Sequence, residues 1–79
     1  MSHRIVQILG PGCPKCRSLY QRAVQAAREL GIECDIRKVS DLDEILAFGI
    51  MSTPALVVDG TVRIHGRVPS VDQLKEMLS

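Results

Sequence analysis

A short apolar run, a Gly-Pro-Gly turn and a pair of cysteines follow one another near the start of the chain, and this order constrains the fold more than any other feature. The cysteines stand in Cys13-Pro14-Lys15-Cys16, which opens a stretch with helical periodicity. The pattern predicts a buried strand that turns sharply into a helix. Two thiols at this spacing can form one disulfide bond, and the N-terminal end of a helix favours the thiolate of the first. The segment is therefore a candidate redox site.

Length and composition indicate one small domain, residues 1–79, with an aliphatic core. Hydrophobic residues make up 46% of the 79 residues, which favours a packed core over disorder. Tyr20 and Phe48 are the only aromatic residues in the sequence. The formal net charge is +1. A chain with so small a net charge and so few aromatic residues has no features of a nucleic-acid-binding protein.

The sequence also bears on the compartment. Its apolar runs are far shorter than the ~20 residues that span a bilayer, so no membrane partner is expected. Residues 1–4 lead directly into the first predicted strand, and we expect no signal peptide. The expected location is cytoplasmic, where structural disulfides are rare and a closely spaced cysteine pair is catalytic or metal-binding. We expect a monomer.

Hydrophobic periodicity predicts four strands and three helices in the order β-α-β-α-β-β-α. The expected strands are residues 4–9, 32–39, 55–58 and 62–65, and the expected helices are residues 14–30, one that begins at Ser40 and one that begins at Ser70. A long helical crossover makes the first two strands parallel. Asp59-Gly60 predicts a hairpin between the last two. The fold class is thus α/β, with a four-stranded mixed sheet flanked by the three helices.

Capping signals define two of the helices. The second helix is expected to begin at Ser40, as its N-cap, and to end at Gly49. Its buried side is expected to consist of Leu42, Ile45, Leu46 and Phe48. Gln73, three residues after Ser70, predicts a capping box at the start of the last helix.

This arrangement resembles the thioredoxin-like superfamily over essentially the whole chain. The resemblance is carried by Gly10-Pro11-Gly12-Cys13-Pro14-Lys15-Cys16, by residues 51–60 and by residues 66–70. In particular, the chain is similar to the small prokaryotic thioredoxin/glutaredoxin hybrids called redox-active disulfide protein 2. A Cys-x-x-Cys pattern alone has low specificity, but its combination with Thr53-Pro54 and the Asp-Gly hairpin is far more specific.

The resemblance implies a thioredoxin/glutaredoxin-like protein disulfide oxidoreductase. It implies that the peptide bond before Pro54 is cis and that this proline faces the two cysteines. A proline at that position lacks an N–H and leaves the preceding backbone open to an extended substrate peptide. The residues expected to bind substrate are Gly12, Pro14, Lys15 and Thr53.

Cys13 is expected to be the nucleophile and Cys16 the resolving cysteine. The helix N-terminus and the nearby Lys15 and Arg17 lower the pKa expected for Cys13. Cys16, one turn inward, then closes the Cys13–Cys16 disulfide and releases the substrate. This redox-active disulfide needs no other cofactor and no metal. The expected partners are protein disulfide substrates and, as electron donor, a thioredoxin-reductase-type protein or glutathione.

Two alternatives place a non-catalytic function on the same fold. The cysteine pair could hold a soft ion such as Cu(I) or Zn(II). A structural zinc site needs four ligands, however, and the spacing of Cys34, His3 and His65 indicates no such set. The other alternative is an interaction module with little turnover. Cys34, on the apolar side of its strand, is expected to be a buried and unreactive core residue.

Several positions depart from the patterns of the two families. Gln7 stands where thioredoxins have a buried acid, and Gly12 stands where they have Trp. Lys15 replaces the Tyr of the glutaredoxin motif, and Gly66-Arg67 replaces the Gly-Gly that contacts glutathione. Arg67 is a candidate contact for a glutathione carboxylate, although a surface role is favoured. These departures concern the identity of the partner more than disulfide exchange itself.

Overall fold

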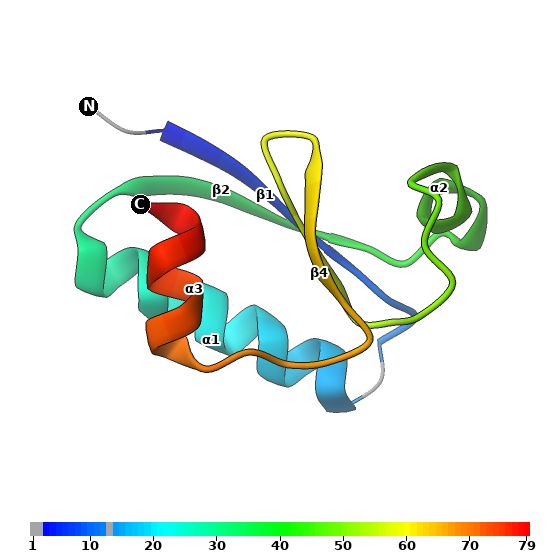
Figure 1. Cartoon of the computed structure of the whole chain (residues 1–79), viewed down its shortest axis with the longest axis horizontal. Coiled ribbons are helices and arrows are strands. Elements are labelled where there is room, and N and C mark those ends of the chain that lie inside the picture. Colours follow the sequence, from blue (N-terminus) through cyan, green and yellow to red (C-terminus); the bar gives the residue numbers. More distant parts are fainter. Residues whose placement is uncertain (1–2, 13) are drawn as a thin grey trace.

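The computed structural model describes residues 3–12 and 14–79, which form a four-stranded sheet and three helices (Figure 1). The strands are β1 (His3–Leu9), β2 (Glu33–Val39), β3 (Ala55–Val58) and β4 (Thr61–His65). The helices are α1 (Pro14–Leu30), α2 (Leu42–Ala47) and α3 (Val71–Leu78). The predicted α/β class and element order are confirmed.

The strands lie in the order β2-β1-β3-β4. β1 and β2 are parallel, with Ile8 opposite Lys38, whereas β3 is antiparallel to both β1 and β4. The predicted mixed sheet and the parallel first pair are confirmed. Because α1 carries the chain from β1 to β2, the C-terminal ends of these two strands meet at one end of the sheet. This is also the end at which α1 begins.

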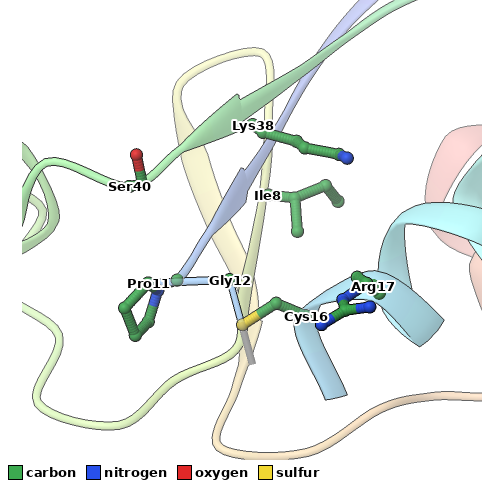
Figure 2. Close-up of a pocket in the computed structure, with 8 residues that line it drawn as sticks. Ile8, Pro11, Gly12, Cys16, Arg17, Lys38 and Ser40 are labelled. Atoms are coloured by element: carbon green, nitrogen blue, oxygen red, sulfur yellow. The ribbon is translucent and has the colours of Figure 1, made fainter. Parts of the chain in front are cut away.

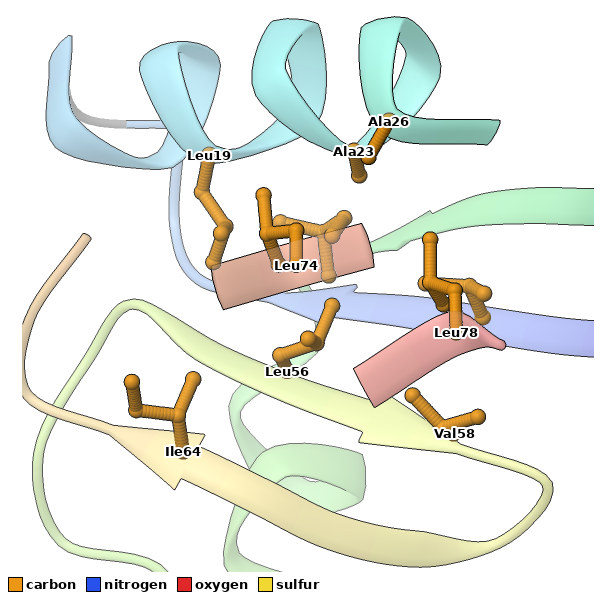
Figure 3. Close-up of a cluster of buried hydrophobic side chains, with 10 residues drawn as sticks. Leu19, Ala23, Ala26, Leu56, Val58, Ile64, Leu74 and Leu78 are labelled. Carbon is orange, nitrogen blue, oxygen red and sulfur yellow. The ribbon is translucent and has the colours of Figure 1, made fainter. Parts of the chain in front are cut away.

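Helices α1 and α3 pack beside each other on one face of the sheet and enclose the larger core (Figure 3). Its buried members are Val6, Ile8, Leu19, Ala23, Ala26, Leu56, Val58, Ile64, Leu74 and Leu78. All of these side chains are aliphatic, as the composition predicts. Burial of so much apolar surface along α1 fixes this helix on the sheet, and with it the position of its first turn.

Helix α2 covers the opposite face of the sheet, over a smaller cluster. The buried members of this cluster are Leu9, Val39, Ile45, Ile50, Ala55 and Val57. The prediction for Leu42 and Leu46 is wrong, because these side chains are 66% and 55% exposed. A helix of six residues has fewer than two turns, and of its four apolar side chains only Ile45 is buried in the cluster.

The start of α2 also differs from the prediction. Asp41, not Ser40, is the N-cap, and its Oδ1 accepts hydrogen bonds from the backbone N–H groups of Asp43 at 2.9 Å and Glu44 at 3.4 Å. A carboxylate caps a helix as well as a hydroxyl does and is further stabilised by the helix dipole. Ser40 is therefore left outside the helix, next to the end of β2.

Two further local predictions are confirmed. Asp59 and Gly60 both have positive φ, 50° and 83°, as the tight hairpin turn between β3 and β4 requires. At the start of α3, Ser70 Oγ accepts from the N–H of Gln73 at 3.2 Å, and Gln73 Oε1 accepts from the N–H of Ser70 at 3.0 Å. This is the predicted capping box.

Candidate functional site

The candidate site lies at the C-terminal end of β1, where the chain turns into α1 (Figure 2). The N–H of Gly10 donates to the carbonyl of Val39 at 2.9 Å, which ties the turn to the end of β2. Gly12 has a φ of 93°, a conformation that favours glycine. Pro14 begins α1, where its missing N–H costs no helical hydrogen bond. The turn thereby places Cys16 in the first turn of α1.

Of the two predicted redox cysteines, Cys13 lies outside the described residues. Cys16 is buried, with 6% of its surface exposed. Its side chain points from α1 back toward the turn that follows β1 (Figure 2). A sulfur in this position is accessible to a neighbouring group of the same chain and shielded from large molecules.

Gly10 brings Cys16 close to the segment that precedes β3. A β-carbon on the buried Gly10 would overlap Cys16 Sγ and would lie 3.9 Å from the β-carbon of Thr53. Cys16 and Thr53 therefore border the same backbone position, and that position accepts only a residue without a side chain. The sequence indicates only a turn at Gly10, because the close approach of Cys16 and Thr53 depends on tertiary packing.

The peptide bond between Thr53 and Pro54 is cis, the isomer that the resemblance implies. Pro54 is buried, and its carbonyl accepts a hydrogen bond from the N–H of Gly66 at 2.9 Å. The preceding residues are exposed, and Met51 most of all, at 96%. This segment is thus anchored at its proline and open to solvent just before it.

A pocket with a volume of about 360 Å³ opens between the β1–α1 turn and the end of β2 (Figure 2). The described residues that line it are Ile8, Gly10, Pro11, Gly12, Cys16, Arg17, Lys38 and Ser40. Ile8, Gly10 and Cys16 are buried and form its inner wall, whereas Arg17, Lys38 and Ser40 are exposed. The resolving sulfur predicted from the sequence therefore borders a pocket with polar residues at its opening.

Positive charge dominates the opening of this pocket. Arg17 extends from α1 and Lys38 from β2, and no carboxylate is present among the described lining residues. Lys38 Nζ lies 4.5 Å from the centroid of the Tyr20 ring, in cation–π contact. This contact holds the Lys38 side chain across the gap between β2 and α1.

The structure distributes the residues expected to bind substrate over neighbouring positions. Gly12 lines the pocket, and Pro14 and Lys15 are exposed at the start of α1. Thr53 is exposed beside Gly10. Lys38 could not be found from the sequence, because it enters the site only through the parallel pairing of β1 with β2.

The third cysteine, Cys34, is half-buried rather than fully buried. It packs against the larger core from β2, an edge strand that α1 covers only in part. This partial burial raises the pKa of the Cys34 thiol above its usual value.

Within residues 3–12 and 14–79, no three His, Cys, Asp or Glu side chains gather in a group that could hold a metal ion. None of the described helices has the length and apolar character needed to cross a membrane.

Comparison with known sequences decides the family. A sequence model described as the thioredoxin domain matches residues 4–79. The chain belongs to the thioredoxin family. It is 42% identical over 74 residues to a thioredoxin of Methanothermobacter thermautotrophicus, a match that covers 94% of this chain and 96% of that protein. A thioredoxin of Methanocaldococcus jannaschii is 39% identical over 74 residues, covering 94% of this chain and 85% of the relative.

A probable thioredoxin of Archaeoglobus fulgidus is 31% identical over 68 residues, covering 86% of this chain and 74% of that protein. The family match and the four-stranded mixed sheet give the chain a thioredoxin-like fold and a thioredoxin-like redox function.

This thioredoxin family member has no buried charged side chain among its described residues. Gln7 is half-buried in β1, where the resemblance places an acid in other thioredoxins.

Proposed function

We propose that this chain is a thiol–disulfide oxidoreductase that works through a reversible Cys13–Cys16 disulfide. The observation that carries the proposal is the position of Cys16. Its buried sulfur lies in the first turn of α1, against Gly10 and next to the segment that contains the cis Thr53–Pro54 bond. Membership of the thioredoxin family supports the same chemistry.

In the reducing direction, the thiolate of Cys13 attacks one sulfur of a substrate disulfide and expels the other as a thiolate. A mixed disulfide between Cys13 and the substrate results. Cys16 then gives its proton to solvent and attacks the Cys13 sulfur, so the Cys13–Cys16 bond forms and the second substrate thiolate leaves. Two electrons pass to the substrate, and its two thiolates take up protons from solvent.

The burial of Cys16 supports this division of roles. A thiol that is 6% exposed is poorly accessible to an external disulfide. Its place in the first turn of α1, three residues after Cys13 in the sequence, suits it to attack a disulfide that Cys13 carries. We therefore assign the first attack to Cys13 and the resolving step to Cys16.

The exposed residues before Pro54 support protein disulfides as substrates. Met51, Ser52 and Thr53 are open to solvent, and Thr53 borders the position shared by Gly10 and Cys16. An extended peptide that lies along this segment would present its disulfide to Cys13. Pro14 and Lys15, exposed at the start of α1, are proposed to contact the same substrate.

We further propose that the protein acts in the cytoplasm as a monomer and receives electrons from a thioredoxin-reductase-type protein or from glutathione. The cysteine content supports this location, because a reducing compartment favours a catalytic pair over structural disulfides. Cys34 has no part in the proposed cycle.

Reduction of insulin disulfides, with dithiothreitol as the electron source, tests the proposal. A Cys34→Ala variant serves as the parent, so that only the pair can react, and it should accelerate the reaction over dithiothreitol alone. In that parent, Cys13→Ser should abolish the acceleration, and Cys16→Ser should accumulate a mixed disulfide visible by intact mass. Full activity of the Cys13→Ser variant would show the mechanism to be wrong.

A further inference from the structure

We propose that the pocket beside Cys16 binds the negatively charged arm of a low-molecular-weight disulfide. We call this pocket the anion pocket. Its described lining residues are Ile8, Gly10, Pro11, Gly12, Cys16, Arg17, Lys38 and Ser40. The inference rests on the proposed disulfide exchange and adds a substrate class to it. Small anionic disulfides should react faster with this chain than neutral or cationic ones of similar size.

The size of the anion pocket suits a small ligand. Its volume of about 360 Å³ is at the lower end of the range of small-molecule sites, roughly 300–1,000 Å³. Ile8 and Pro11 supply apolar surface, and Cys16 lies at the inner wall. A short aliphatic arm fits such a wall while its sulfur stays near Cys16 and its charged end reaches the opening.

The groups at the opening are suited to an anion. The Arg17 guanidinium and the Lys38 ammonium approach from two different walls, α1 and β2 (Figure 2). The Ser40 hydroxyl lies at the other side of the pocket and points away from both cations (Figure 2), so the proposed anion contacts are Arg17 and Lys38. Carboxylate, sulfonate and phosphate groups all accept hydrogen bonds from such donors.

Lys38 is partly fixed before a ligand arrives. Its Nζ lies 4.5 Å from the centroid of the Tyr20 ring, so one end of this long side chain already has a contact on α1. A cation held in place loses less side-chain freedom on binding than a mobile one does. The contact thereby favours a defined site over diffuse attraction.

The charge at the opening is local and is not a property of the whole chain. The formal net charge is only +1, which gives little general attraction for anions. The acids closest in the sequence to Lys38 and Ser40 are Asp35, Asp41 and Asp43, and none of them lines the pocket. Arg17 and Lys38 are the only charged residues among the described lining residues, and the proposal assigns the preference for anions to them.

The test uses three symmetrical disulfides that differ in charge: 3,3′-dithiodipropionate (anionic), bis(2-hydroxyethyl) disulfide (neutral) and cystamine (cationic). The reduced Cys34→Ala protein is mixed with each, and formation of the protein disulfide is followed by acid quenching, alkylation and intact mass. Each rate constant is divided by that of dithiothreitol with the same disulfide, which removes the intrinsic reactivity of the reagent.

The normalised rate constant of the anionic disulfide should exceed that of the neutral one by about tenfold at low salt, with the cationic one slowest. Two unit charges near the ligand give an effect of roughly this size at a solvated site. High salt should reduce the advantage, because it screens the exposed cations.

Charge variants then locate the effect. Arg17→Gln with Lys38→Gln should bring the anionic disulfide down to the level of the neutral one, and Arg17→Glu with Lys38→Glu should favour cystamine. Arg63→Gln is the matched control. It removes one exposed cation from β4, at the other edge of the sheet, and should keep the preference for the anion.

The outcomes separate the two proposals. Equal normalised rates for the three disulfides, or a preference that survives Arg17→Gln with Lys38→Gln, would overturn the anion pocket and leave the oxidoreductase intact. If none of the three disulfides oxidises the reduced protein, the proposed function itself is wrong, and the pocket's role is wrong with it.

Discussion

Gly10 lies so close to Cys16 that a β-carbon on Gly10 would overlap the sulfur atom. The same β-carbon would lie 3.9 Å from the β-carbon of Thr53. Three segments therefore meet at this one glycine: the end of β1 and the start of α1, which are close in the sequence, and the loop before β3, which is distant from both. Because Gly10 has no side chain, the Cys16 sulfur of α1 can pack against the end of β1.

Gly10→Ala is expected to destabilise the reduced protein by about 1–3 kcal/mol, the usual cost of an added methyl group in a packed site. It should also slow disulfide exchange, since the Cys16 sulfur must move. Urea unfolding and the insulin assay measure the two effects.

A Cys16→Ala background provides the control. The sulfur is absent there, and the β-carbon of residue 16 lies 3.4 Å from the carbon that Gly10→Ala adds. The cost of Gly10→Ala should be clearly smaller there, and an equal cost in both backgrounds would show that the sulfur is not the obstacle.

Asp59 should make stability depend on pH. Its carboxylate accepts hydrogen bonds from the N–H of Ile5 at 2.9 Å and from Arg4 at 2.8 Å, and these bonds hold the pKa of Asp59 below its usual range. A carboxyl with a lowered folded-state pKa stabilises the fold above its unfolded pKa of about 3.9. That contribution is lost as the pH falls through the folded-state value.

Asp59→Asn should therefore be less stable than the wild type at pH 7, and the difference should narrow as the pH falls below about 4. Asparagine tolerates the positive φ of 50° at this position, so the backbone conformation is retained. Urea unfolding at several pH values measures the free energy of both proteins. Glu76→Gln, which removes an exposed carboxylate from α3, controls for net charge. A difference that stays constant down to pH 3 would contradict the assigned hydrogen bonds.

Two leucines should differ sharply in their effect on stability. Leu74 of α3 is fully buried in the larger core, and Leu42 of α2 is 66% exposed. Leu74→Ala is expected to cost about 2–5 kcal/mol, because it leaves a cavity between α3 and the sheet. Leu42→Ala should change the free energy of unfolding by less than about 0.5 kcal/mol. Similar costs at the two positions would contradict the placement of α2.

Cys34 should react slowly with alkylating reagents in the folded protein. Its partial burial raises the pKa of the thiol, so less thiolate is present at neutral pH. The measurement is iodoacetamide alkylation of a Cys13→Ser, Cys16→Ser protein, in which only Cys34 can react. The rate should rise when the same protein is unfolded in urea. Equal rates in the folded and unfolded protein would place this thiol at the surface.

Local sequence patterns predicted the features that depend on neighbouring residues. Asp59-Gly60 predicted the hairpin because few residues adopt two successive positive φ angles, and Ser70 with Gln73 predicted the capping box. The pattern over Leu42 to Phe48 was less informative. Periodicity shows that a helix is amphipathic, but it does not show how much of a short helix reaches the sheet, and Leu46 was misplaced for this reason.

The pocket could not be predicted in the same way. Lys38 stands 22 positions after Cys16 and becomes its neighbour only because Ile8 pairs with Lys38 in the parallel register of β1 and β2. Ser40, which lies between β2 and the Asp41 cap of α2, also borders the pocket. Both positions depend on tertiary pairing, which no local pattern of residue types determines.

An equilibrium redox titration of the Cys34→Ala protein in thiol–disulfide buffers, followed by alkylation and intact mass, tests whether Cys13 and Cys16 form a redox couple. We expect one reversible transition in which the ratio of disulfide to dithiol changes tenfold for every ~30 mV, as a two-electron couple requires. The transition should disappear in the Cys16→Ser variant. If both thiols remain reduced across the whole range, Cys13 and Cys16 are not a redox couple and the account is wrong.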